Sequence, residues 1–183
     1  MRGGSPASFI DGRRPIAERP DIADRAVPGH WEADLMAFSA PGQSLLFLHE
    51  RSSRFLRVTR QCGKTAHSVA DALIRQLHTV PAPLRRTLTF DNGTEFALHR
   101  RLVDTLNLDT FFCDVRSPWQ KGGVENAIGR LRRYLPRKTN LPALSEADID
   151  DHTRRYNNTP RKCLGFLTPA EVFSSIQRVA LQS

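Results

Sequence analysis

The sequence predicts an α/β fold in which helices pack on a mixed β-sheet. Three segments with strand character follow one another at short spacing over residues 30–60, which is typical of hairpins. Two later strand-like segments, 85–90 and 109–113, each follow a stretch with helical spacing. Hairpins join antiparallel strands, whereas helices join parallel ones, so we expect five strands in one mixed sheet flanked by helices.

The first strand is expected over residues 30–38, in the segment HWEADLMAF. Trp31, Ala33 and Leu35 alternate with Glu32 and Asp34, so the two sets point to opposite faces of the sheet. The next two strands are expected in the segments SLLFLHE and RFLRVTR, which span 44–50 and 54–60. The connections APGQ and RSS are short enough for hairpins.

A helix is expected over residues 65–80, with Thr65 as its N-cap. Its apolar residues at helical spacing are Val69, Leu73 and Leu77. A fourth strand, RRTLTF, follows at 85–90. A second helix is expected near 94–106, where leucines recur every four residues, and the fifth strand is DTFFC at 109–113.

The segment 121–135 predicts a helix with two different faces. Its apolar stripe, expected to pack on the sheet, is Val124, Ile128, Leu131 and Leu135. Its second stripe is basic and consists of Asn126, Arg130, Arg133 and Arg137. Glu125 lies at the border between the two. A closing helix begins further on, where Thr168, Pro169 and Glu171 occupy the N-cap, N1 and N3 positions.

The amino-acid composition limits the classes of protein to which this chain can belong. The chain has 183 residues, of which 39% are hydrophobic, so it can bury a core. Its net charge of +8 favours a polyanionic partner such as nucleic acid, although a merely basic surface gives the same balance. The three cysteines have no metal-ligand spacing, and we expect buried thiols in a reducing cytoplasm. No signal peptide or membrane span is evident, which predicts a soluble, intracellular protein.

Three acids stand at places where carboxylates can do chemistry. Asp34 lies on the face of its strand opposite Trp31, Asp91 ends the fourth strand, and Glu125 borders the basic stripe. Clustered carboxylates repel one another unless a cation neutralises them, and hard oxygen ligands favour Mg²⁺ or Mn²⁺. The turn Asn92-Gly93 is expected to let Asp91 project at the strand end.

Each acid also has a simpler interpretation. Asp34 can be a solvent-facing strand residue, Asp91 a turn residue, and Glu125 a helix-surface acid. Two neighbours compete for the same roles: Glu32 shares the face of Asp34, and Glu95 lies in a first helical turn, where an acid favours the helix dipole.

Four segments in order resemble the catalytic region of the IS-thirty family of bacterial insertion-sequence transposases, within the DDE transposase and integrase group. They are GHWEADLM, FDNGTEFALH, SPWQKGGVENAIGRLRRYLP and YNNTPRKCLGFLTPAEVF. The resemblance runs from about Arg14 to Val172 and implies an RNase H-like fold. It also implies that Asp34, Asp91 and Glu125 form a catalytic triad holding two ions of Mg²⁺ or Mn²⁺.

The implied reaction is cleavage of double-stranded DNA at transposon ends and joining to target DNA, by a homodimer or a higher multimer. Phosphates would be held by basic residues on and near the helix, namely Lys121, Arg130, Arg133, Arg137 and Lys138. A solvated helix face is the alternative for this stripe. Trp119 can stack on a base, but packing under the helix start is favoured.

We expect residues 1–28 to be a linker or mobile N-terminal arm and residues 29–178 to be the catalytic core domain. The family usually carries an N-terminal helix-turn-helix, in whose place this chain has only a short linker. An alternative is therefore a truncated, non-catalytic DNA-binding remnant that regulates a full-length transposase. A nuclease for RNA–DNA hybrids is a third hypothesis, and a zinc hydrolase is disfavoured because the six histidines lack ligand spacing.

Overall fold

The computed structural model describes residues 10–20, 25–63, 65–115 and 117–182. Five strands form one mixed sheet in the spatial order β3-β2-β1-β4-β5. They are β1 (His30–Ala37), β2 (Gln43–Glu50), β3 (Leu56–Cys62), β4 (Thr87–Phe90) and β5 (Asp109–Phe112). β1 is antiparallel to β2 and parallel to β4, and β4 is parallel to β5. The predicted mixed sheet is confirmed, with strand bounds within two residues of those expected.

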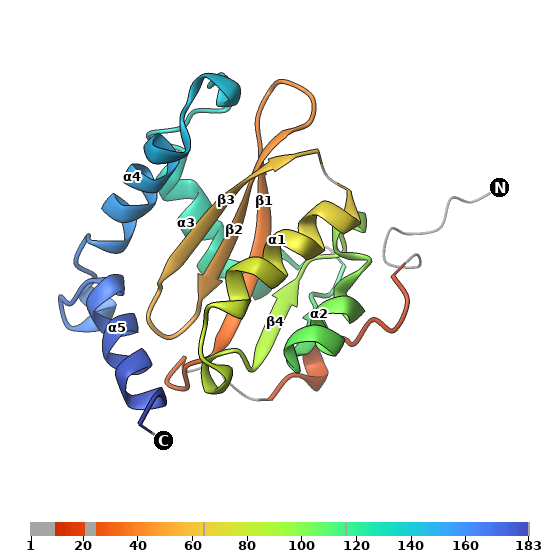
Figure 1. Cartoon of the computed structure of the whole chain (residues 1–183), viewed down its shortest axis with the longest axis vertical. Coiled ribbons are helices and arrows are strands. Elements are labelled where there is room, and N and C mark those ends of the chain that lie inside the picture. Colours follow the sequence, from red (N-terminus) through yellow and green to blue (C-terminus); the bar gives the residue numbers. More distant parts are fainter. Residues whose placement is uncertain (1–9, 21–24, 64, 116, 183) are drawn as a thin grey trace.

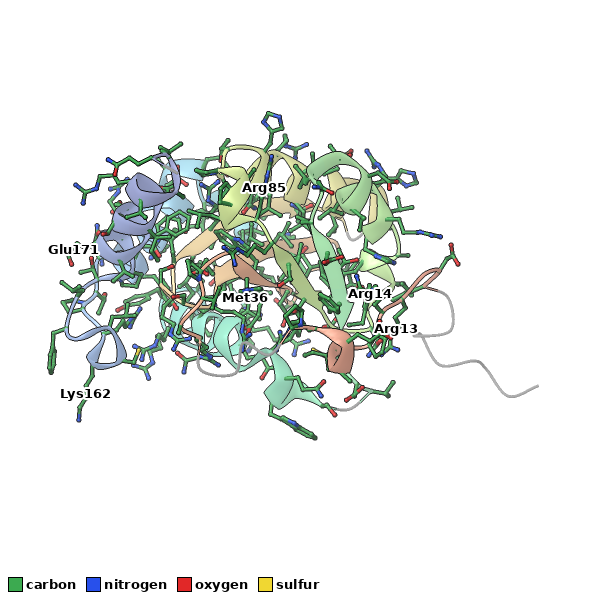
Figure 2. The ribbon with its side chains drawn as sticks, turned by 90° about the horizontal axis from the view of Figure 1, so that it is seen from below. Arg13, Arg14, Met36, Arg85, Lys162 and Glu171 are labelled. Carbon is green, nitrogen blue, oxygen red and sulfur yellow. The ribbon has the colours of Figure 1, made fainter. Side chains whose placement is uncertain are left out.

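Helices cover both faces of the sheet (Figure 1). They are α1 (Ala66–His78), α2 (His99–Leu106), α3 (Gly122–Leu131), α4 (Glu146–Asn157) and α5 (Pro169–Ala180). Seen along the sheet in Figure 2, α1 and α2 lie on one side and α3 on the other. Each side has its own apolar core: Trp31 and Ala33 belong to the core under α1 and α2, and Met36 to the core under α3.

The helix starts agree with the sequence. The Thr65 side chain accepts a hydrogen bond from the Ser68 backbone N–H at the start of α1. Thr168 and Glu171 cap α5 reciprocally, each side chain accepting the other's backbone N–H. A side-chain acceptor satisfies an N–H that has no partner within the helix, so these starts are fixed locally.

Two predicted helices are shorter than expected. In place of one helix over 94–106, the chain makes a 3₁₀ turn at Thr94–Phe96 and then α2. Phe96 stacks on Phe90 with 4.6 Å between ring centroids, and this buried contact favours the tighter turn. The helix expected over 121–135 ends at Leu131, and the chain after it continues in turns. Pro136 disfavours helical geometry at Leu135, the residue that precedes it.

Part of the predicted linker packs on the sheet edge, so the expectation of an unpacked arm is wrong for residues 10–19. We call Ile10–Arg19 the N-terminal strap. Ile10 is buried in the core under α2, and Pro15 makes a parallel bridge to Phe112 at the edge of β5. The Arg14 guanidinium pairs with Asp109 at 2.7 Å and lies over the ring of Phe111. Residues 1–9 and 21–24 of the predicted arm lie outside the described residues.

The cysteine expectation holds only in part. Cys113 is buried, whereas Cys163 is exposed, and the side chain of Cys62 lies outside the described part of the chain. Burial raises the pKa of the Cys113 thiol to about 12, so it stays protonated and unreactive. In the described ranges no helix is long and apolar enough to cross a lipid bilayer.

Candidate active site

Asp34 and Asp91 meet just past the end of β4, where the neighbouring strand β1 continues toward Ala37. The parallel register pairs Glu32 with Thr89, and two further residues along each chain bring Asp34 level with Asp91. Asp34 Oδ2 lies 3.0 Å from Lys121 Nζ, and Asp91 Oδ2 lies 3.1 Å from the same nitrogen. The sheet thus brings two of the three predicted acids together around one cation.

Lys121 is the residue whose position differs most from the prediction. Its side chain is only 3% exposed, and its ammonium bridges Asp34 and Asp91 beneath the start of α3. This location does not suit the predicted role of holding DNA phosphates on an open surface. The sequence carries no signal for the bridge, because Asp91 and Lys121 lie 30 positions apart in the chain.

Burial and the bridge together shift the pKa values of Asp34 and Lys121. Burial raises the pKa of Asp34, partly offset by the attraction of Lys121. Burial by itself lowers the pKa of Lys121, but the two carboxylates outweigh it and the net pKa of Lys121 is raised. Both pKa values are raised, but for different reasons: at Asp34 burial outweighs the attraction of one cation, whereas at Lys121 the attraction of two anions outweighs burial.

The acidic turn after β4 is held in place from two sides. Asp91 Oδ1 accepts a hydrogen bond from the Gly93 N–H at 2.9 Å. Asn92 donates to the Cys113 carbonyl, and its own Oδ1 accepts from Arg13 Nε of the N-terminal strap at 2.7 Å. Figure 2 shows Arg13 and Arg14 on this edge of the molecule. Sequence reasoning missed this contact, because Arg13 lies 79 residues before Asn92.

Gly93 has a different role from the one expected. Its φ of −67° is open to any residue, so no left-handed backbone is needed at the turn. A Cβ at Gly93 would instead lie 2.6 Å from the carboxyl group of Glu95. The glycine therefore makes room for that side chain and does not release Asp91 by its own flexibility.

Glu125 lies in the first turn of α3, and Glu32 anchors this turn to β1. Glu32 Oε2 accepts a hydrogen bond from the Val124 N–H at 2.8 Å. The approach is close: a Cβ at Gly123 would meet Glu32 Oε2 at 2.6 Å and the His49 ring at 3.0 Å. Burial raises the pKa of Glu125, as do the charges of Asp34, Glu32 and Asp91, while Lys121 opposes the shift.

Glu32 belongs to a buried polar cluster rather than to the cation bridge. Its Oε1 lies 3.1 Å from Arg51 Nε, and the exposed fractions of the two side chains are 1% and 7%. His49 completes the cluster, and its Nδ1 has no hydrogen-bond partner among the described residues. Burial lowers the pKa of His49 to about 3, which keeps the ring neutral. Of the two acids on this face of β1, Glu32 therefore supports α3 and Asp34 faces the bridge.

The other predicted DNA-binding residues are exposed, in contrast to Lys121. They are Arg130, Arg133, Arg137 and Lys138. Arg132 lies over the Phe38 ring at 5.0 Å and donates to the Ala37 carbonyl, so it belongs to the fold. Trp119 is 73% exposed, so the expectation that it packs under the helix start is wrong. The indole is held in solvent by a 3₁₀ turn, Pro118–Lys121, that buries Lys121 instead.

The carboxylates suit a hard divalent cation in part. Asp34 Oδ2 and Asp91 Oδ2 already converge on a positive charge, and carboxylate oxygens are the donors that Mg²⁺ and Mn²⁺ prefer. Within the described part of the chain, no three His, Cys, Asp or Glu side chains are gathered closely enough to hold a metal as they stand. As the described residues stand, Glu125 is not gathered with the two aspartates into such a group.

Comparison with known proteins places this site in context. No family model matches the chain. A transposase of insertion sequence element IS1086 from Cupriavidus metallidurans is 38% identical over 157 residues, covering 86% of this chain and 46% of that protein. The InsI transposase of IS30A from Escherichia coli is 38% identical over 159 residues, covering 86% and 41%.

This chain is a homologue of IS30-family transposases. A further relative, the transposase of IS4351 from Bacteroides fragilis, is 33% identical over 169 residues, covering 92% of this chain and 52% of that protein. The resemblance inferred from the four sequence segments is therefore confirmed. The chain spans about half the length of the curated relatives it matches, or somewhat less.

The fold is that of an integrase core. The crystal structure of the catalytic core domain of BIV integrase matches with a TM-score of 0.63 and 21% identity, covering 82% of this chain and 97% of that one. The predicted RNase H-like class is thus confirmed.

Proposed function

We propose that the chain carries out metal-dependent cleavage of DNA strands and their transfer to a target. The observation that carries the proposal is the convergence of Asp34 and Asp91 on one cation, between the central strand β1 and the end of β4. Glu125 stands in the first turn of the adjoining helix, within electrostatic reach of both. The homology to transposases supports the reaction class, a polynucleotidyl transfer of the DDE type.

Asp34, Asp91 and Glu125 are the residues that would hold two divalent ions, Mg²⁺ or Mn²⁺. When bound, such ions activate the attacking hydroxyl and stabilise charge on the phosphate and leaving oxygens. The chain's own residues orient the groups: Gly93 N–H and Leu35 N–H each fix one carboxylate oxygen, leaving Oδ2 of both aspartates toward the site. Lys121 neutralises the paired aspartates and keeps them together.

The reaction has two steps of the same kind. In cleavage, the oxygen of water bonds to phosphorus, the P–O3′ bond breaks, and the proton passes to the leaving 3′-oxygen. In strand transfer, the freed 3′-OH attacks a phosphodiester of the target and displaces its 3′-oxygen in turn. Neither step needs a covalent bond to the protein.

Double-stranded DNA is the proposed substrate, at transposon ends and at the target. The exposed cations Arg130, Arg133, Arg137 and Lys138 would bind its phosphates, which fixes position without reading sequence. Trp119, exposed beside the site, is available to stack on a base. We further propose that the chain acts in the bacterial cytoplasm, at the nucleoid, as a dimer or a higher multimer on paired ends.

The test is nicking of supercoiled plasmid by the purified chain in Mg²⁺, Mn²⁺ or EDTA. Glu125→Gln is the test variant, and Glu95→Gln is the matched control, since Glu95 is an acid near Asp91 that lies outside the proposed set. We expect metal-dependent nicking that Glu125→Gln loses and Glu95→Gln keeps. Nicking that survives Glu125→Gln contradicts the triad.

Two other outcomes favour the alternative functions. DNA binding without any nicking, in all three conditions, favours the non-catalytic DNA-binding regulator. Cleavage of an RNA–DNA hybrid in preference to duplex DNA favours a nuclease of the RNase H type. A calorimetric titration with Mn²⁺ adds a readout that does not depend on activity, because Glu125→Gln should weaken metal binding in the proposed site.

A further inference from the structure

A second polar site lies between α3 and α4, apart from the site of Asp34 and Asp91. It is a pocket of about 90 Å³, a volume suited to one small group and a few waters. Its principal side chains are Arg130, Arg133, Tyr134, His152, Arg155 and Arg161. None of the described residues that line it is acidic.

The positive charge of this pocket is only partly compensated. Asp151 is the carboxylate nearest in the hydrogen-bond network, and it is shared between Arg154 and Arg155 at 3.4 and 2.9 Å. Arg130 donates to the neutral amide of Asn126. Arg161 is 8% exposed, lies over the Tyr156 ring at 4.5 Å and donates to the Tyr156 carbonyl. Guanidinium groups without a carboxylate of their own favour an anionic guest.

Two aromatic side chains and a histidine form part of the pocket wall. The ring of Tyr134 stacks on that of His152 with 5.8 Å between centroids. His152 Nδ1 is buried and has no hydrogen-bond partner among the described residues. Tyr156 is buried below, in the core under α3. A small pocket with forked guanidinium donors is suited to a tetrahedral oxyanion rather than to an apolar ligand.

The position of the pocket suggests where that anion comes from. Arg130 and Arg133 line it and also belong to the exposed basic residues proposed to bind DNA. We propose that the pocket between α3 and α4 binds one backbone phosphate of the DNA. It would serve as a positioning site separate from the site of Asp34 and Asp91. This inference rests on the proposed function, because it requires that DNA is bound along α3.

Arg155 and Arg154 make a matched pair for the test. They are neighbours on α4, both pair with Asp151, and both side chains are 65% exposed, but only Arg155 lines the pocket. Each of Arg155→Gln and Arg154→Gln removes one positive charge. Non-specific electrostatic attraction therefore predicts equal effects on DNA affinity, whereas a phosphate in the pocket predicts unequal effects.

The first measurement is the affinity for a fluorescent DNA duplex over a series of salt concentrations. We expect Arg155→Gln to weaken binding about fivefold and to reduce the slope of log affinity against log salt by about one. Arg154→Gln should change the slope by much less. Equal slopes for the two variants overturn the proposal, and thermal melts check that both variants are folded.

The second measurement separates a DNA phosphate from free phosphate. Single methylphosphonates, which are neutral, are placed at successive positions of the duplex. We expect one position to weaken binding to the wild-type chain and to have no further effect on Arg155→Gln, as a shared contact requires. If inorganic phosphate competes equally with DNA on wild type and Arg155→Gln, the pocket is not the site and the proposal fails.

The failures of the two proposals are distinguishable. A wild-type chain that binds no duplex overturns both the proposed function and the phosphate site. Duplex binding and nicking that respond to Glu125→Gln, together with identical behaviour of Arg155→Gln and Arg154→Gln, overturn the phosphate site alone.

Discussion

Two carboxylates two residues apart on the same face of β1 have different environments. Glu32 is enclosed: its side chain is 1% exposed and faces Arg51 and the Val124 N–H. Asp34 is 19% exposed and shares the Lys121 ammonium with Asp91, which is itself 43% exposed. Removing one partner of an enclosed ion pair leaves a buried charge uncompensated, whereas water can solvate a partly exposed acid that loses its cation.

The start of α3 joins the two environments. Lys121, just before the helix, reaches the Asp34 side, and Val124, in its first turn, rests on Glu32. Glu125 follows directly after Val124. Glu32 therefore positions α3, and α3 carries Glu125 on the side of Asp34 and Asp91. Four changes test this division, given from the largest expected effect to the smallest.

Asp34→Asn should abolish the proposed DNA nicking. Loss of one charged group at a reacting centre costs on the order of a thousandfold in rate, or about 4 kcal/mol in the activation barrier. The free energy of unfolding should change little, because the amide still fits and repulsion from Asp91 is relieved. Nicking rates and urea unfolding measured on the same preparation check both. Full nicking activity in this variant contradicts the assignment of Asp34.

Glu32→Gln should act mainly on stability. It leaves the buried Arg51 without a counter-ion, and a broken buried pair costs roughly 3 kcal/mol. Urea unfolding measures the loss. Arg51→Met in the Glu32→Gln background is the control: removing both charges should recover part of the stability. A Glu32→Gln chain as stable as wild type contradicts the structural role of this acid.

Lys121→Met should destabilise the chain in a way that metal reverses. Without the ammonium, Asp34 and Asp91 repel each other. Both are partly solvated, so the cost is about 1 kcal/mol. In EDTA the melting temperature should fall, and added Mg²⁺ should restore more stability to the variant than to wild type. An equal effect of Mg²⁺ on both chains shows that Lys121 does not occupy the place of a metal ion.

The enclosed cluster should also make stability depend on pH. The pKa of His49 is lowered to about 3 by burial, and next by the positive charges of Arg54, Arg25, Arg51 and Arg161. The unfolded chain takes up a proton near pH 6.5 while the folded ring stays neutral, so stability is full above this value and declines as the pH falls toward 3. The Glu32 carboxylate of the same cluster faces the ring across Gly123.

Between pH 7 and pH 6 this loss amounts to about 0.7 kcal/mol for one such histidine. The free energy of unfolding, followed over this interval, measures it. His49→Gln should remove the contribution of His49 to the slope of unfolding free energy against pH. The contribution of His30 should remain, because burial is the chief cause that lowers its pKa to about 4. Identical slopes in wild type and His49→Gln mean that the ring is not held neutral by the fold.

Sequence periodicity predicted much of the fold. Alternation along β1 put Glu32 and Asp34 on one face and Trp31 on the other, and the two cores confirm it. The run ending at Asp91 and the caps at Thr65 and Thr168 were also readable, because each depends on neighbours within a few residues. Local spacing determines which way a side chain points, and that information lies in the chain itself.

Only the tertiary structure decided what each of those side chains meets. It separated Glu32 from Asp34, placed Lys121 between two aspartates, packed the N-terminal strap on β5 and left Trp119 in solvent. Each of these outcomes depends on residues far apart in the chain, such as Arg13 and Asn92. The free energy of a buried charge depends on the partners that the whole fold brings to it, and no spacing along the sequence encodes them.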